Sequence, residues 1–372
     1  MTSRAPAPGE APVGFKVNAR TQGRLLEVAG LRTRFRTPAG VVRAVDGVSL
    51  TLDRGRTLGI VGESGSGKSV LSRSIMGLLP RRNVVREGTI EFDGERIDTL
   101  ADRRRRDLWG TQMAMVFQDP MTALNPVLKI GHQITEGLRF HLGLDRRTAR
   151  QNALALLRSV GIPEPERRLG QYPHELSGGM RQRIMIAVAL ACGPRLLFAD
   201  EPTTALDVTV QAQILDLLAA QQRERNMAMV LVTHDLGVVA GRADHIAVMY
   251  AGQIVEMAPA TALFGDVQMP YTEALLRSIP RLDQPRARRL QAIPGRPPNL
   301  IAPPRGCRFA PRCPYARPDC HAEAPPLVES SPGHLYRCWY PVGGGAGTGG
   351  TAGNGGTGGT AGNGGNGSTG GI

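Results

Sequence analysis

A glycine-rich segment that ends in lysine and serine is the part of this chain best suited to chemistry. Residues 62–69, the phosphate-binding loop, fit the pattern GxxxxGK[ST] at every fixed position. Glycines let successive amide N–H groups surround phosphates at a helix N-terminus, where the helix dipole also favours negative charge. We expect Lys68 to place its cation against the phosphates and Ser69 to ligate Mg²⁺. The candidate binding residues are Gly62, Glu63, Ser64, Gly65, Ser66, Gly67, Lys68 and Ser69.

Two acids form a second candidate group. Asp200 and Glu201 follow the apolar run 196–199, and acids at the C-terminal end of a strand lie where open α/β sheets bind ligands. We expect Asp200 to hold Mg²⁺, directly or through water. Glu201 is the candidate general base for the water that attacks the γ-phosphate. A solvated acidic loop is the alternative, which the phosphate-binding loop disfavours.

A third candidate is residues 176–183, LSGGMRQR, which we name the signature segment. It opens an apolar helix that stops at the pair 193–194, and Ser177 is expected to cap that helix. A second helix N-terminus able to bind an anion would result. An ordinary N-cap followed by two flexible glycines is the alternative.

These segments need strands and helices to position them. Short apolar runs of the length of buried parallel strands occur at residues 58–61, 113–117, 196–199, 229–232 and 246–249. Helical patterns at 148–160 and 208–225 separate several of them, which predicts an α/β layer architecture. The region from about 120 to 193 is expected to be mainly helical, as an insert in the α/β core.

Composition divides the chain of 372 residues into four parts. A Pro/Ala-rich lead, 1–23, and a glycine-rich tail, 343–372, are expected to be disordered because neither can build an apolar core. A globular region, 24–260, lies between them and is followed by a segment rich in Pro, Arg and Cys, 261–342, which we name the C-terminal extension.

The net charge of +13 raises nucleic acid or an anionic membrane as possible partners. Only three of the 45 basic residues are lysine, and aromatic residues make up 4% of the chain. Codon bias and solvated surfaces explain such a skew better than a binding patch does, so no specific nucleic acid is expected. The longest apolar run, 184–192, is too short to span a bilayer, and the N-terminus lacks a secretory apolar stretch, so we expect a cytosolic protein without disulfides.

With LSGG followed by Gln182 and Arg183, the sequence resembles the ATP-binding-cassette family. The other sequence motifs of the family are also present along the chain, in the family's order. The resemblance implies a P-loop NTPase with a RecA-like core, an antiparallel β subdomain and a helical subdomain. It also implies ATP and Mg²⁺ as ligands. Further site residues implied by the resemblance are Gln118, Ser177, Gly178, Gly179, Asp207 and His234.

The family assigns a role to each of these positions. By resemblance, Gln118 senses Mg²⁺ and the membrane-spanning partner, and His234 contacts the γ-phosphate. Asp207 communicates across the nucleotide-bound dimer, in which Ser177 of one cassette completes the site of the other. Phe35 is the candidate for stacking on adenine, with packing in the antiparallel sheet as its alternative; a loop, 36–42, is expected to follow it.

Further segments resemble one subclass of this family, the peptide importers. Residues 118–126 and 200–211 are similar to the peptide-importer subclass. Residues 294–298 and 306–314 resemble the C-terminal extension of oligopeptide and dipeptide transporter ATPases. Its four cysteines are Cys307, Cys313, Cys320 and Cys338. Their spacing, Cx5Cx6Cx17C, makes a four-thiolate metal site plausible without fixing the metal. The resemblance favours a [4Fe-4S] cluster, with zinc or free structural thiols as alternatives, whereas Cys192 is expected in the core of the signature helix.

The resemblance therefore predicts the ATP-hydrolysing subunit of a peptide importer at the cytoplasmic face of the cell membrane. Its partners would be a second cassette, two transmembrane permease subunits docked on the helical insert, and an extracytoplasmic peptide-binding protein. An importer for nickel or another small solute is the nearest alternative. A soluble nucleic-acid-associated cassette ATPase would be expected to show duplicated cassettes or coiled-coil insertions, which the sequence lacks. Glu201 and His234 argue against a non-catalytic partner cassette.

Overall fold

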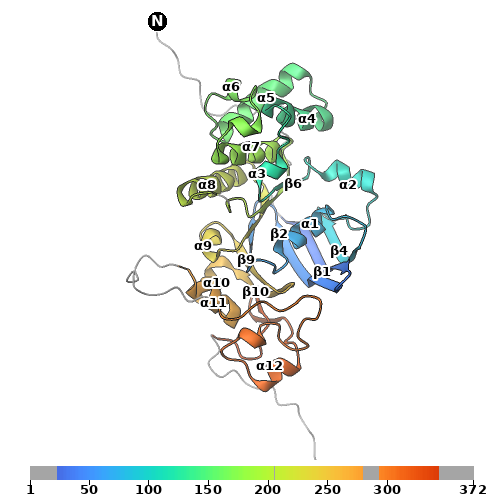
Figure 1. The fold of residues 1–372 in the computed structure, drawn as a ribbon, viewed down its shortest axis with the longest axis vertical. Coiled ribbons are helices and arrows are strands. Elements are labelled where there is room, and N and C mark those ends of the chain that lie inside the picture. The colour runs from blue at the N-terminus through green and yellow to red at the C-terminus, as the bar shows by residue number, and fades with distance from the viewer. Residues whose placement is uncertain (1–22, 205, 280–292, 343–372) are drawn as a thin grey trace, which may run out of the picture.

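The structure, a computed structural model, describes residues 23–204, 206–279 and 293–342 (Figure 1). The predicted lead, apart from Gly23, and the predicted glycine-rich tail lie outside the described residues. The helices of residues 120–193 lie at one end of the molecule and the C-terminal extension lies at the other (Figure 1). Both are connected through a central sheet.

The central sheet has eight strands in the order β11-β12-β10-β9-β3-β8-β7-β6. The five strands from β9 to β6 are parallel, whereas β10, β12 and β11 pair antiparallel. All five predicted strands are confirmed as members of its parallel part. The bounds are β3 Thr57–Val61, β6 Met113–Val116, β7 Leu196–Asp200, β8 Ala228–Thr233, β9 His245–Tyr250, β10 Gln253–Pro259, β11 Val328–Ser331 and β12 His334–Tyr336.

Both faces of the parallel strands are covered, which explains their unbroken apolar sequences. On β7, Leu196 and Phe198 belong to the core shared with the antiparallel sheet, whereas Leu197 and Ala199 belong to the core shared with the helices. Successive side chains point to opposite faces of a strand, so one apolar run supplies two cores. Helix α8, Val208–Glu224, covers the second of these faces.

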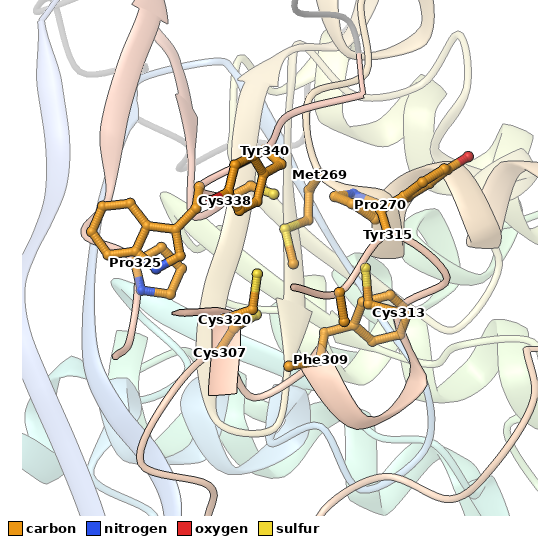
Figure 2. A pocket seen from close by; sticks show the side chains of 13 residues that line it. Met269, Pro270, Cys307, Phe309, Cys313, Tyr315, Cys320, Pro325, Cys338 and Tyr340 are labelled. Atoms are coloured by element: carbon orange, nitrogen blue, oxygen red, sulfur yellow. The ribbon is translucent and has the colours of Figure 1, made fainter. Parts of the chain in front are cut away.

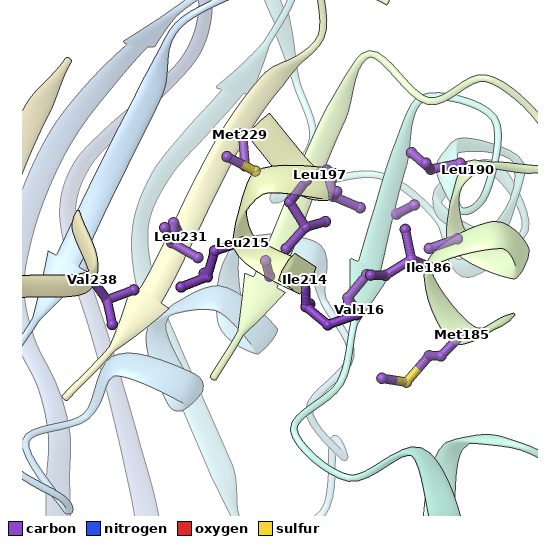
Figure 3. Packing of buried hydrophobic residues seen from close by; sticks show 14 of the residues in the cluster. Val116, Met185, Ile186, Leu190, Leu197, Ile214, Leu215, Met229, Leu231 and Val238 are labelled. Atoms are coloured by element: carbon purple, nitrogen blue, oxygen red, sulfur yellow. The ribbon is translucent and has the colours of Figure 1, made fainter. Parts of the chain in front are cut away.

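Figure 3 shows the packing on that helical face. Leu197 of β7 and Met229 and Leu231 of β8 lie beside Ile214 and Leu215 of α8. These side chains are almost completely buried, with exposed fractions of 4% or less. The packing of α8 against the sheet therefore holds the strands, and the loops that follow them, in fixed positions.

A second sheet precedes and follows the phosphate-binding loop in sequence. It has the order β2-β1-β4-β5, with β1 Arg24–Thr37, β2 Gly40–Asp53, β4 Val84–Phe92 and β5 Glu95–Arg96. The loop expected at 36–42 is wrong: only Pro38 and Ala39 form the turn, and the residues on either side pair as a β-hairpin. Arg36, Thr37 and Val41 are exposed, so these strand residues lack the apolar pattern of a buried strand.

The remaining helices connect and cover the sheets. The region 120–193 holds α3 Pro120–Ala123, α4 Ile130–Leu142, α5 Arg146–Ser159, α6 Pro165–Arg168, a 3-10 turn Pro173–Glu175 and α7 Gly178–Leu190. Elsewhere lie α1 Lys68–Met76, α2 Asp102–Leu108, α9 Leu236–Val239, α10 Ala260–Gly265, α11 Pro270–Arg277, a 3-10 turn Ala310–Arg312 and α12 Pro318–Ala322. Within the described ranges, no helix is both long enough and apolar enough to cross a bilayer.

Cys192 lies in the turn after α7 rather than on the helix, because α7 ends at Leu190. Its side chain is partly buried against the core of the helical region. That burial raises the pKa of the Cys192 thiol to about 11.

The C-terminal extension is continuous with the central sheet. Strand β12 pairs with β10, with Glu256 opposite Tyr336, and β11 pairs with β12. Phe309 of the extension packs against Tyr250 of β9 and Tyr271 of α11, with ring centroids 5.4 and 5.3 Å apart. The expected domain boundary at residue 260 therefore divides the strands of one sheet, and the side chains of one core, between two parts of the chain.

Phe309→Ala should test how firmly this extension is packed. The ring is 1% exposed, so its loss should lower the free energy of unfolding by roughly 3–5 kcal/mol. Chemical denaturation followed by circular dichroism would measure the change. Phe140→Ala, at a ring that is 81% exposed on α4, is the matched control and should change stability by about 0.5 kcal/mol or less. Equal losses in both variants would contradict this account.

Candidate nucleotide-binding site

The phosphate-binding loop joins β3 to α1, as the sequence predicts. Gly67 is the N-cap of α1, with φ 103°, and no side chain caps the first turn. A Cβ atom at Gly67 would lie 2.2 Å from the carbonyl oxygen of Ala44, and one at Gly62 would lie 2.0 Å from that of Met249. Glycine is therefore required at both positions, and the uncapped N–H groups of α1 are suited to bind phosphate.

Lys68 lies inside the loop with its side chain 4% exposed. Its ammonium donates hydrogen bonds to the carbonyl oxygens of Gly62 at 2.7 Å and Glu63 at 3.1 Å. Burial lowers the pKa of Lys68, while the carboxylates of Glu201 and Asp200 oppose this shift. A buried ammonium held by carbonyl dipoles is well suited to approach a phosphate.

Asp200 ends β7 and is completely buried. One carboxylate oxygen accepts a hydrogen bond from the Ser69 hydroxyl at 2.7 Å. The other oxygen has no hydrogen bond, and its nearest cation is Arg73 at 3.7 Å. Burial raises the pKa of Asp200, and the Ser69 hydrogen bond opposes the rise. A buried carboxylate oxygen without a hydrogen bond, beside a hydroxyl, fits a site for Mg²⁺.

Glu201 is the residue on which the polar side chains converge. Its Oε2 accepts hydrogen bonds from the amide of Gln118 at 3.3 Å and from the hydroxyl of Thr204 at 3.0 Å. His234 Nδ1 lies 3.5 Å from the same oxygen, and the ammonium of Lys68 lies 3.7 Å from Oε1. The structure therefore brings together the four residues predicted to be catalytic.

The sheet order explains this convergence. The phosphate-binding loop follows β3, His234 follows β8, and Gln118 follows β6. Asp200 is the last residue of β7, and Glu201 comes directly after it. These four strands are adjacent and parallel. Their carboxyl ends meet at one edge of the sheet, where doubly wound folds bind ligands.

Ser177 caps α7, as predicted, by accepting a hydrogen bond from the N–H of Met180 at 3.3 Å. A Cβ atom on Gly179 would lie 3.0 Å from a methyl group of Val210, and one on Gly178 would lie 3.8 Å from Leu206. The signature glycines therefore pack against the start of α8. Across the described ranges, no hydrogen bond or ion pair joins residues 177–179 to the phosphate-binding loop.

Asp207 caps α8 by accepting a hydrogen bond from Val210 N–H at 3.0 Å. Phe35 lies near the end of β1, half-buried, with Val42 and Val84 as its cross-strand neighbours. Phe35 is therefore part of the antiparallel sheet. Its role toward adenine stays a prediction.

Sequence reasoning missed three side chains of this site. Thr204 lies in the segment 200–211, but the sequence assigned no role to this residue. Its separation of three residues from Glu201 was the available signal for a contact between the two. Tyr271 accepts a hydrogen bond from the N–H of Glu63, and Arg312 forms an ion pair with the Glu63 carboxylate. Both lie more than 200 residues beyond the loop, so no local pattern could have revealed them.

The four cysteines of the extension line one cavity, which we name the thiol cavity (Figure 2). All four are free of disulfides, and Met269, Phe309 and Tyr340 contribute to its wall. Burial raises the pKa of Cys307 and Cys313, and raises that of Cys338 to about 12. In the part of the chain that the structure covers, no three His, Cys, Asp or Glu side chains are grouped closely enough to hold a single metal ion.

Comparison with known proteins adds the decisive observations. The ABC transporter family matches residues 45–204, and the C-terminal region of oligopeptide/dipeptide transporters matches residues 255–320. The chain is 50% identical over 318 residues to the dipeptide transport ATP-binding protein DppD of Escherichia coli (strain K12), a match covering 86% of this chain and 97% of that protein. The chain belongs to the ATP-binding-cassette transporter family.

Other relatives agree with this assignment. The oligopeptide transport ATP-binding protein OppD of Salmonella typhimurium (strain LT2) is 51% identical over 318 residues, covering 86% of this chain and 94% of that protein. Among solved structures, the dimeric ATP-binding cassette MJ0796 in a post-hydrolysis state bound to ADP and Pi has a TM-score of 0.58 at 27% identity. It covers 63% of this chain and 99% of that chain. The predicted cassette fold is confirmed, and the protein is an ATP-hydrolysing cassette.

Glu201→Gln tests the proposed general base of this cassette. The amide keeps the size of the side chain but cannot accept a proton, so ATP should still bind while turnover falls by about two orders of magnitude or more. Steady-state ATP hydrolysis and equilibrium ATP binding would measure the two effects. Glu166→Gln, on the exposed surface of α6, is the matched control and should hydrolyse ATP at the wild-type rate. Near-normal turnover in Glu201→Gln would remove Glu201 from this role.

Proposed function

We propose that this chain is the ATP-binding and hydrolysing subunit of an importer for dipeptides or oligopeptides. The observation that carries the proposal is the identity of about 50% to proteins named for dipeptide and oligopeptide transport, over 94% or more of each. The match of residues 255–320 to the C-terminal region of such transporters supports it independently of the cassette. An importer for nickel or another small solute would use the same catalytic residues and remains the alternative within the family.

Each charged residue of the site has a role in this function. Lys68 and the first turn of α1 hold the phosphates of ATP, and Ser69 with Asp200 would hold Mg²⁺. The ion, when bound, neutralises charge on the phosphate oxygens. Glu201 takes a proton from the attacking water, and Gln118 and Thr204 fix its carboxylate. His234, 3.5 Å from the same carboxylate, contacts the γ-phosphate in this proposal.

The second half of the site comes from another cassette. The N-terminus of α7 is capped by Ser177 and makes no hydrogen bond to the phosphate-binding loop of its own chain in the described ranges. We expect two cassettes to pair so that residues 177–179 of each meet ATP held by the other. ATP binding would close the pair and hydrolysis would reopen it. The dimeric state of the similar cassette MJ0796 supports this arrangement.

The helical region between β6 and β7 is the proposed docking surface for two membrane-spanning permease subunits. Large apolar side chains are exposed there, including Met121 at 53%, Val127 at 76% and Phe140 at 81%. Exposed apolar groups on one region of a protein are typical of an interaction surface. The chain would then lie at the cytoplasmic face of the membrane and receive peptides through the permeases from an extracytoplasmic binding protein.

Purification from membranes tests the importer function. A tagged chain should co-purify with two membrane-spanning subunits, and added dipeptides or oligopeptides, with their binding protein, should stimulate ATP hydrolysis. Nickel salts are the matched control substrate and should leave the rate unchanged. A chain that purifies alone or with nucleic acid would favour the soluble cassette ATPase instead. Stimulation by nickel but not by peptides would favour the small-solute importer.

We also propose that Cys307, Cys313, Cys320 and Cys338 hold a [4Fe-4S] cluster. Cys307, Cys313, Cys320 and Cys338 line one cavity and supply the four thiolates that such a cluster needs. Zinc would require the four sulfurs to lie about 2.3 Å from one ion. Zinc, held by the same four thiolates, is the alternative.

Anaerobic purification tests the cluster. The wild-type protein should absorb visible light and contain about four irons per chain. Cys338→Ser should lose both, whereas Cys192→Ser should keep both, because Cys192 lies outside the thiol cavity. A colourless protein that holds one zinc per chain would reject the cluster, and a colourless protein without metal would leave the cysteines as free thiols.

A further inference from the structure

Glu63 of the phosphate-binding loop is held by side chains from the C-terminal part of the chain. The Arg312 guanidinium donates to both carboxylate oxygens of Glu63, at 2.6 and 2.9 Å. The hydroxyl of Tyr271 accepts a hydrogen bond from the Glu63 N–H at 2.9 Å. Both groups of Glu63 that could move, its backbone and its carboxylate, are therefore fixed from outside the loop.

Arg312 is itself rigidly placed. Its side chain is 3% exposed, and it also donates to the carbonyl oxygen of Pro294 at 2.8 Å and to the hydroxyl of Tyr250 at 3.2 Å. Its guanidinium lies over the rings of Tyr250 and Phe309, 5.8 and 6.0 Å from their centroids. A partly buried two-point ion pair of this kind is stronger and more directional than a fully exposed pair.

The contact reaches the residues that bind phosphate. The carbonyl oxygen of Glu63 accepts hydrogen bonds from the Lys68 ammonium at 3.1 Å and from the N–H of Ser66 at 3.1 Å. A displacement of Glu63 would therefore change the position of the lysine and of the loop backbone together. Glu63 is the first variable position of the loop pattern, so the pattern alone gives it no function.

We infer that Arg312 and Tyr271 are positioning residues for ATP binding, which hold the phosphate-binding loop open for the nucleotide through Glu63. The inference rests on the ATP-binding function proposed above and adds residues of the C-terminal region to it. Neither residue touches ATP in this account. Their main effect is on the affinity for ATP rather than on the chemical step, because Glu201 itself is held by Gln118 and Thr204.

Arg312→Gln in the full chain, assembled with its membrane partners, tests the inference. The KM for ATP should rise about tenfold, since one charged two-point contact is lost, while kcat at saturating ATP should change less than about twofold. Arg312→Lys keeps the charge but cannot bind both oxygens, so its KM should rise only about threefold. In the double variant with Glu63→Gln, the KM should rise no more than in the more affected single variant.

Two further variants separate positioning from general damage. Arg337→Gln removes a half-buried arginine of the same extension that donates to the carbonyl oxygen of Ile254 and does not contact the loop, so its KM for ATP should stay at the wild-type value. Tyr271→Phe keeps the packed ring and removes only the acceptor for the Glu63 N–H, so its KM should rise even if Arg312→Gln fails to fold.

The outcomes are distinct. An unchanged KM in both Arg312→Gln and Tyr271→Phe, or an equal rise in Arg337→Gln, would overturn the inference and leave the ATP-binding function intact. A wild-type chain with no measurable affinity for ATP would overturn that function together with the inference.

Discussion

Opposite charges held close together with little water are the constraint on which the site depends. Lys68, Asp200 and Glu201 are each buried or nearly so at the carboxyl edge of the central sheet. Such a cluster is unfavourable unless every charge has a partner. Most of these partners are present within the protein: carbonyl oxygens for the lysine, a hydroxyl for one acid, and an amide and a hydroxyl for the other. One oxygen of Asp200 has no hydrogen bond, and a magnesium ion brought by the nucleotide would satisfy it.

The sheet makes this cluster possible because four adjacent parallel strands end at the same edge. Each strand contributes one element of the site, and two apolar cores prevent the strands from shifting against one another. Glu201 also adopts a left-handed backbone conformation, with φ 46°. Strain of this kind persists only where the surroundings hold the residue firmly. Backbone and side-chain contacts together thus fix the orientation of the Glu201 carboxylate.

Local sequence was enough to predict the parallel strands, the phosphate-binding loop and the helix cap at Ser177. Each of these is set by neighbouring residues: apolar runs by burial on both faces, the loop by glycine geometry, and the cap by a serine hydroxyl. The hairpin after Phe35 was missed because its strand residues are exposed or only partly buried, so they show no apolar alternation. The contacts of Arg312 and Tyr271 with Glu63 were missed because they depend on tertiary packing across more than 200 residues. The place of the extension in the central sheet was missed for the same reason.

The position of β12 in the sheet has a consequence for folding during protein synthesis. Its pairing partner, β10, ends at Pro259, and β12 begins only at His334. During synthesis, the edge of β10 that pairs with β12 therefore stays unpaired while more than 70 further residues are added to the chain. Until β12 has been made, that edge is open to pairing with another nascent molecule, so a chaperone that shields it would favour correct assembly.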